Sequence, residues 1–251
     1  TYDGKEHTVS GFTGAPEAAD FSAIQVGARG TNAGTYPAAF REDAKGTVDA
    51  TRKYIVTNAI DGALVINPIA DKVTVTVTEK SDTVTYDGTE HTVTGYESIT
   101  ADNTLYNVKA SVQETPTAAW TAKGTNAGEY PVGVKAEDFE NINKNFDNVE
   151  FVIVDGVLKI DPVKAEVTVT IMGNHATVLY NAREHTVQGY TATSSNPLFN
   201  VDTDFTYGQD GPSGEAAKAK AKASGVNVKR HEMGLQSRDF VTVSQNFQHV
   251  T

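Results

Sequence analysis

The sequence contains no cysteine and few basic residues. A chain of 251 residues without cysteine forms neither disulfides nor thiolate metal sites. Its 32 acidic residues outnumber its 21 lysines and arginines, which leaves a formal net charge of -11. Such a chain lacks the positive field that draws nucleic acid or anionic lipid. We therefore expect no nucleic-acid partner.

Long apolar runs and catalytic motifs are also absent. No stretch approaches the roughly 20 apolar residues of a membrane span, so we expect no membrane insertion in this fragment. There is no G-x-S-x-G motif and no glycine-rich phosphate loop followed by lysine. We therefore expect no enzymatic activity, no catalytic residues and no cofactor.

One motif occurs three times in the chain. Its copies are TYDGKEHTVSGF at 1–12, TYDGTEHTVTGY at 85–96 and, less well preserved, LYNAREHTVQGY at 179–190. The tyrosine in second place recurs after 84 and 94 residues, which is the length of whole domains rather than of solenoid units. Two further motifs, GTNAG-x-YP and D-G-x-L-x-I-x-P, recur in the same register in the first two copies.

We divide the chain into three copies on this basis. The first, 1–69, lacks the strand that precedes the motif in the other two. The second, 70–163, is complete, and the third, 164–251, lacks the last strand. We expect the sequence to be a window cut from a longer array. Short linkers such as NPIADK at 67–72 contain proline and no flexible glycine or serine tract, which should limit bending.

Apolar alternation predicts short strands throughout. VTVTVT at 73–78 alternates valine with threonine, as a half-buried strand does. Three Asp-Gly pairs are predicted to close two-residue hairpin turns, because both residues tolerate positive φ: Asp3 and Gly4, Asp87 and Gly88, and Asp155 and Gly156. Asn181 and Ala182 replace the pair in the third copy, at a cost in turn stability. Residues 215–224 favour a helix by composition, but their register with the other copies predicts a strand.

About eight short strands per copy, without a helical period, predict an all-β fold of antiparallel β-sandwiches. NAGTYPA and NAGEYPV match the immunoglobulin-type tyrosine corner, with Tyr36 and Tyr130 as the corner residues. The third copy departs from this pattern, because His231 stands at the corner. Pro37 and Pro131 follow the corner and predict either an open sheet edge or a bulge there.

Together, the motifs resemble the Ig-like repeats of bacterial cell-surface adhesin-like proteins, and the likeness covers nearly the whole chain. The resemblance implies tandem immunoglobulin-like domains in an elongated extracellular rod at the cell surface or cell wall. It implies a structural stalk for cell adhesion, with neighbouring repeats and a host surface protein or glycan as partners. Two alternatives stay open: a carbohydrate- or mucin-binding module, and a self-assembling filament subunit whose open sheet edge a partner completes.

A repeated Glu-His dipeptide is the obvious candidate for acid–base chemistry. It occurs at Glu6 and His7, Glu90 and His91, and Glu184 and His185. Neighbouring residues on a strand point to opposite faces, so a pair cannot converge on one substrate atom and a structural role is favoured. One histidine per copy also makes no metal coordination sphere.

A run of four side chains offers oxygen ligands at alternate positions, as a calcium loop does: Asn141, Asn143, Asn145 and Asp147. Lys53 replaces the closing carboxylate in the first copy, which favours a polar loop and no metal. The resemblance also raises lysine–asparagine crosslinks, with Lys72 and Lys159 as possible donors. DGVLKIDP supplies no asparagine at the matching place, so we favour none.

Trp120 is a candidate platform for stacking a sugar. Its counterparts in the other copies, Val26 and Ala221, predict an interior position instead.

The copies differ most between the first two motifs, where 28, 38 and 45 residues separate the tyrosine from the following glycine. The longer segments, 97–116 and 191–214, are the best candidates for partner contacts. They share NTLYNV and NPLFNV, an insertion whose leucine and aromatic residue are predicted to anchor the loop. The possible ligand contacts are Asn103, Tyr106, Asn196 and Phe199.

Overall fold

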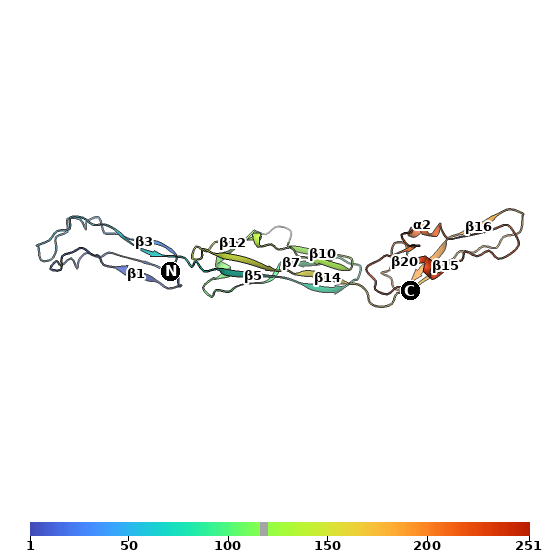
Figure 1. The fold of residues 1–251 in the computed structure, drawn as a ribbon, viewed down its shortest axis with the longest axis horizontal. Coiled ribbons are helices and arrows are strands. Elements are labelled where there is room, and N and C mark those ends of the chain that lie inside the picture. Colours follow the sequence, from blue (N-terminus) through green and yellow to red (C-terminus); the bar gives the residue numbers. More distant parts are fainter. Residues whose placement is uncertain (116–119) are drawn as a thin grey trace. The chain divides into compact units, whose positions relative to one another are not determined.

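The computed structural model describes residues 1–115 and 120–251, and its regular structure is mainly β (Figure 1). Strands account for 39% of the chain and helices for 6%, which confirms the all-β class. The sheets of the described residues are small, with two or three strands each. No helix within 1–115 or 120–251 has the length and apolar character to cross a membrane. Pro116, the last residue of the predicted segment 97–116, lies outside the described residues.

Residue contacts divide the chain into two compact units. The first consists of Thr1–Glu79, Tyr96–Ala119 and Val134–Asp155, and the second of Lys80–Gly95, Trp120–Gly133 and Gly156–Thr251. The predicted copy boundaries, after residues 69 and 163, fall inside these units, one in each. The units therefore differ from the three predicted copies, because each unit contains a set of contacts that joins two neighbouring copies.

The first unit contains a three-stranded sheet in the order β13-β5-β8. β5 (Val73–Glu79) follows the predicted alternation, since its three valines are fully buried and its threonines half-buried. β13 (Val149–Val154) joins it in parallel and β8 (Tyr96–Ala101) antiparallel. The other elements of this unit are β1 (His7–Ser10) paired with β2 (Gly27–Gly30), β3 (Gly34–Ala38) with β4 (Gly62–Ile66), β9 (Val112–Glu114) with β12 (Phe139–Asn141), α1 (Val108–Ser111) and the 3-10 turn Ala136–Asp138.

The second unit contains a sheet in the order β11-β14-β6. β14 (Val157–Asp161) lies between β11 (Gly128–Pro131), which is antiparallel to it, and β6 (Asp82–Thr85), which is parallel. The other elements are β7 (His91–Thr94) paired with β10 (Thr121–Gly124), β15 (Val169–Gly173) with β17 (Tyr190–Ser194), β16 (His185–Gln188) with β19 (Lys222–Gly225), β18 (Phe205–Tyr207) with β20 (Phe240–Thr242), α2 (Gly214–Lys218) and the 3-10 turn Ser237–Asp239.

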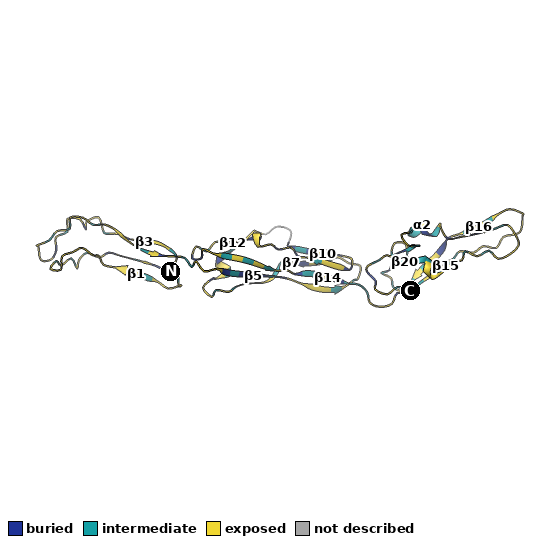
Figure 2. Cartoon of the chain, in the orientation of Figure 1, coloured by how far each residue is buried: buried dark blue, intermediate teal, exposed yellow. Residues whose placement is uncertain are grey.

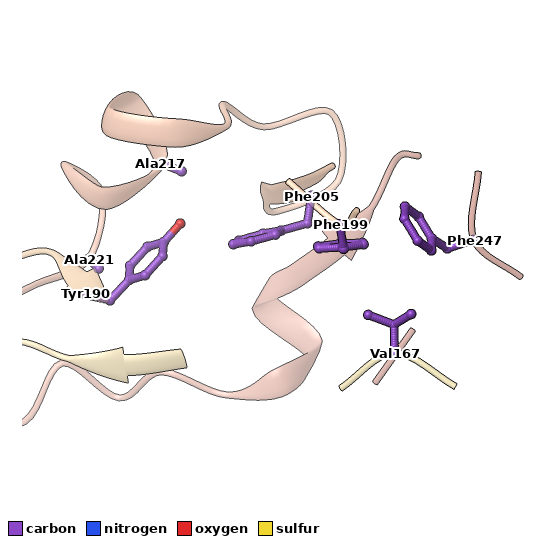
Figure 3. Packing of buried hydrophobic residues seen from close by; sticks show 7 residues of the cluster. All are labelled: Val167, Tyr190, Phe199, Phe205, Ala217, Ala221 and Phe247. Carbon is purple, nitrogen blue, oxygen red and sulfur yellow. The ribbon is translucent and has the colours of Figure 1, made fainter. Parts of the chain in front are cut away.

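Aromatic side chains pack in a buried core of each unit. In the second unit, Phe199 lies against Phe205 and Phe247, with ring centroids 6.5 Å and 5.1 Å away (Figure 3). In the first unit, Tyr106 and Phe146 pack with Val73 and Val75 of β5. Burial differs between strands: β5 alternates buried with half-buried residues, whereas β1 is mostly exposed (Figure 2).

The predicted two-residue hairpins are wrong. β6 and β7 flank Asp87 and Gly88 but pair with β14 and β10 rather than with each other. β13 and β14 flank Asp155 and Gly156 and belong to different sheets. No strand precedes Asp3 and Gly4 within residues 1–6. Gly4 and Gly88 do have positive φ, +78° and +80°, so the backbone turns there as expected. The turn chemistry is local, whereas the choice of strand partner is not.

Two pairings are parallel, contrary to the predicted purely antiparallel arrangement. β13 and β14 are the last strands of the second copy, and they return beside its first strands, β5 and β6. Parallel neighbours need a long crossover, and the whole copy supplies it. β3 and β11 lie at sheet edges, which agrees with the open-edge alternative for Pro37 and Pro131.

The predicted strand at 215–224 is wrong over its first half, where α2 forms, and only its end belongs to β19. Helix propensity is reinforced by an ion pair between Lys218 and Glu215, 2.7 Å apart. The third copy is also seven residues longer than the second between its motifs, which leaves chain for a helical turn. Ala217 and Ala221 are both buried, so the predicted interior position of Ala221 is confirmed.

Candidate functional site

The same set of contacts joins the first copy to the second and the second copy to the third. We call these sets the first joint and the second joint. The first joint consists of Tyr2, Gly4, Ala33 and Ile69 on one side and Leu105, Asn145 and Phe146 on the other. The second joint consists of Tyr86, Gly88, Ala127 and Val163 on one side and Leu198, Asn246 and Phe247 on the other.

A buried phenylalanine lies at the centre of each joint. The ring of Tyr2 meets Phe146 edge to face, with centroids 5.8 Å apart, and Tyr86 meets Phe247 in the same way at 5.7 Å. The two phenylalanines are only 2% and 6% exposed. Such aromatic pairs stabilise by about 0.5–1.5 kcal/mol beyond the area they bury. The tyrosine of the repeated motif therefore serves contact with the next copy.

The linkers between copies are held through their backbones. Ile69 donates its N–H to the carbonyl of Asn145 and accepts the N–H of Asp147, at 2.8 Å and 3.0 Å. Val163 repeats this pattern with Asn246 and Gln248, at 2.9 Å and 3.0 Å. A linker residue that both donates and accepts a backbone hydrogen bond has less conformational freedom than a linker without such bonds.

An asparagine amide bridges the two sides of each joint. Asn145 accepts the backbone N–H of Ala33 at 2.6 Å and donates to the side chain of Asn32 at 3.1 Å. Asn246 makes the same two bonds to Ala127 and Asn126, at 2.7 Å and 3.1 Å. The amide oxygen accepts one backbone N–H of each GTNAG turn, which is part-buried in the first joint and buried in the second.

The inserted loop of one copy covers the Asp-Gly turn of the preceding copy. A Cβ atom on Gly4 would lie 3.3 Å from Leu105 Cδ2, and one on Gly88 would lie 3.2 Å from Leu198 Cδ2. Two features therefore favour glycine at this position: its positive φ and the close approach of a leucine side chain.

These contacts change the interpretation of the predicted ligand-binding residues. Tyr106 and Phe199 are each only 4% exposed, and their rings pack on Phe146 and Phe247 at 5.0 Å and 5.1 Å. Their predicted role as ligand contacts is replaced by one in the core, while their predicted role as loop anchors agrees with the structure.

The two asparagines of the insertion start its turn. Asn103 accepts the backbone N–H of Leu105, and Asn196 accepts that of Leu198, both at 2.9 Å. Each asparagine therefore presents the leucine that covers the preceding copy. The signal in the sequence was that the second and third copies share the insertion and the first copy lacks it.

The amides of the run considered for calcium, and predicted to be a polar loop, are used in hydrogen bonds. Asn141 Oδ1 accepts the Tyr106 hydroxyl at 2.9 Å and the N–H of Asn143, while Asn143 donates to Ser111 at 2.8 Å. Asn145 belongs to the first joint. Among residues 1–115 and 120–251, no three His, Cys, Asp or Glu side chains gather as a metal site.

A side chain reaches the backbone carbonyl four residues upstream in all three copies, from tyrosine in the first two and from histidine in the third. Tyr36 and Tyr130 donate to the carbonyls of Asn32 and Asn126, four residues upstream, at 2.8 Å and 2.9 Å. His231 Nε2 lies 3.2 Å from the carbonyl of the residue that corresponds to these asparagines, Asn227. The Nε2-protonated tautomer of His231 makes the same bond as the tyrosine hydroxyl.

Each corner ring lies directly on a glycine. A Cβ atom would come within 2.3 Å of the Tyr36 ring at Gly30 and of the Tyr130 ring at Gly124, and within 2.1 Å of His231 at Gly225. Side chains do not approach so closely, which explains why the first residue of the GTNAG motif stays glycine even where histidine replaces tyrosine.

The histidines of the Glu-His dipeptides bind the Asp-Gly turn rather than the neighbouring glutamate. The Nε2 atoms of His7, His91 and His185 lie 2.9–3.0 Å from Oδ1 of the residue four positions upstream. Asp87 also accepts the hydroxyl and N–H of Thr89, and these bonds, followed by that of His91, lower its carboxyl pKa to about 2. The arrangement stabilises a turn and brings no acid–base pair together.

The remaining predicted residues have structural surroundings. Trp120 is 9% exposed. Asp155 is exposed, and Gly156 accepts the N–H of Val132 at 3.3 Å. The two lysines considered for crosslinks are about half-exposed; Lys72 forms an ion pair with Glu150, and Lys159 lies 3.5 Å from Asp161.

Comparison with known proteins found no family model, curated protein or solved structure that matches this chain.

Proposed function

We propose that the chain is a non-enzymatic spacer, the stalk region of a bacterial cell-surface adhesin-like protein built from tandem Ig-like β-sandwich copies. The observation that carries this proposal is the repetition of the joint. Tyr2 with Phe146 and Tyr86 with Phe247 make the same contact with nearly the same geometry. A protein whose role is to propagate a fixed spacing needs identical connections between its copies.

The most variable segment supports the same conclusion. Loops that differ in length on a common scaffold often carry binding sites. In this chain the insertion places Leu105 and Leu198 on the preceding copy and buries Tyr106 and Phe199. The inserted residues thus make contacts between copies, which favours a spacer over a carbohydrate-binding module.

The corner geometry supports an immunoglobulin-like copy. A tyrosine hydroxyl bonded to the backbone a few residues upstream is the hallmark of the corner in that class of sandwich. Tyr36 and Tyr130 both make this bond, across four residues. An extracellular location follows from the resemblance in the motifs and belongs to the proposal.

Small-angle scattering on the whole chain tests the spacer. A compact globule of 251 residues has a radius of gyration of about 18 Å, and we expect a value well above this. The paired variant Asn145→Ala with Asn246→Ala should broaden the distribution of distances, because it removes the amide bridge of both joints. A radius near that of the globule contradicts the proposal.

A further inference from the structure

The first and last strands of the second copy pair with each other in parallel. In the first unit, β13 lies beside β5 over six register pairs. In the second unit, β14 lies beside β6 over four register pairs. Each of these two ladders therefore joins a strand from the start of the copy to a strand from its end.

The ladders lie close to the linkers through which the chain enters and leaves the copy. Ile69 of the first joint is four residues before β5 and forms a parallel bridge with Phe146. Val163 of the second joint is two residues after β14 and forms a parallel bridge with Phe247. Tension that arrives along the chain thus reaches the strands of the ladders without first straightening a long loop.

The parallel direction decides how tension acts on each ladder. A pull on the linker before β5 draws that strand toward its amino end, while a pull on the chain after β13 draws β13 toward its carboxyl end. Because the two strands point the same way, these pulls are opposed along the strand axis. The pulls on β6 and β14 are opposed in the same manner. The paired strands are therefore loaded in shear, and can separate only by sliding past each other.

Shear loads all the bonds of a ladder together. When two strands are peeled apart from one end, the hydrogen bonds break one after another, and each contributes only about 0.5–1.5 kcal/mol of net stability. When the strands slide, the bonds along the six pairs of β5 and β13 have to give way in one step. The same ladder therefore resists shear more strongly than peeling.

Apolar side chains shield both ladders from water. The three valines of β5 are 0% exposed, and Leu158 and Ile160 of β14 are 0% and 1% exposed. A hydrogen bond in such surroundings is stronger than one in water, and no solvent molecule is at hand to replace a strained partner. Burial thus adds to the resistance that the parallel direction creates.

We infer that the second copy has a further function, which is to resist tension, and that the β5–β13 and β6–β14 ladders carry this tension in shear. The inference rests on the proposed function, because a stalk is pulled from both of its ends. It goes beyond that function, because a spacer whose terminal strands were peeled apart would keep the same spacing and yield at a lower force.

The test is single-molecule force spectroscopy on the whole chain, pulled in two directions. The chain contains no cysteine, so a pair of introduced cysteines gives unique attachment points for the handles. Asp71→Cys with Asp155→Cys attaches the handles at opposite ends of the β5–β13 ladder and loads it in shear. Asp71→Cys with Asn148→Cys attaches both handles at the same end and peels it. All three replaced residues are exposed.

We expect the shear pair to rupture at a force about twofold or more above that of the peel pair at the same pulling rate, because forced unfolding depends on the barrier along the pulled direction. Urea denaturation should give equal free energies of unfolding for the two variants, which shows that only the direction differs. A rupture force in shear that equals or falls below the force in peeling overturns the inference.

Small-angle scattering on the same chain tells this failure apart from failure of the spacer. An extended chain with equal rupture forces in the two directions overturns the role in tension and leaves the spacer in place. A compact chain contradicts the spacer, and with it the reason for which the second copy would be pulled.

Discussion

The Asp-Gly turn of the second copy and its counterpart in the third copy have the same backbone and different surroundings. Gly88 has φ of +80° and Ala182 of +58°, and in both turns a histidine binds the first residue. Tyr86 packs on a phenylalanine of the next copy, whereas Tyr180 is 62% exposed. The turn thus forms by itself, and glycine becomes essential only where a leucine lies on it.

The corners of the same two copies show the complementary effect. Tyr130 and His231 both lie on a glycine and both reach a carbonyl four residues upstream. Yet the segment at Tyr130 is a strand paired with β14, and the segment at His231 is not a strand. A contact within a few residues therefore forms whether or not its segment is paired in a sheet.

The largest effect should come from removing the ring at the centre of the second joint. Phe247→Ala deletes a buried phenylalanine that contacts Tyr86 and Phe199, and should lower the free energy of unfolding by about 3–5 kcal/mol in urea denaturation. Tyr180→Ala removes an exposed ring and should change it by less than about 0.5 kcal/mol. An equal loss of unfolding free energy in the two variants would contradict the conclusion that the second turn is packed against the next copy and the third turn is exposed.

A smaller loss should follow from the amide bridge. Asn246→Ala leaves the buried N–H of Ala127 without its acceptor and should cost about 1–3 kcal/mol in urea denaturation. The control is Asn227→Ala, at the exposed counterpart of Asn126 in the third copy, which should be nearly neutral. A neutral Asn246→Ala argues that the amide does not hold the joint.

Exchanging the turn residues should have opposite signs in the two copies. Gly88→Ala forces a Cβ into positive φ against Leu198 and should cost about 1–2 kcal/mol. Ala182→Gly relieves an unfavourable φ and should stabilise by about 0.5–1 kcal/mol at most. Thermal unfolding of both variants checks the prediction, and a destabilised Ala182→Gly contradicts the role given to its backbone.

The smallest effect concerns pH. The pKa of the Asp87 carboxyl is lowered to about 2 from its ordinary 3.8, so its contribution to stability is complete above 3.8 and is lost as the pH falls through about 2. Asn181 stands at the same place in the third copy and does not titrate. Carbon NMR of the Asp87 carboxyl should give a depressed pKa, and Thr89→Ala should raise it. A carboxyl pKa at the ordinary value would contradict the hydrogen bonds from Thr89 and His91 to Asp87.

Much of the local structure followed from the sequence. The alternation of β5, the interior places of Trp120 and Ala221 and the anchoring role of the inserted aromatic residues all depend on periodicity or on alignment between copies. The hairpins, the purely antiparallel sheets and the strand at 215–224 were wrong, because partner choice depends on segments far away in the chain.

The sequence by itself determined the turns, corners and apolar faces, since these require particular residues within a few positions of one another. Only the tertiary structure decided that the repeated tyrosine, the Asn-Phe pair and the inserted loop meet at a joint, because they come from different copies. It also decided which strand lies beside which. Short-range sterics and hydrogen bonds can be read along a chain, whereas burial and pairing depend on what the folded chain brings together.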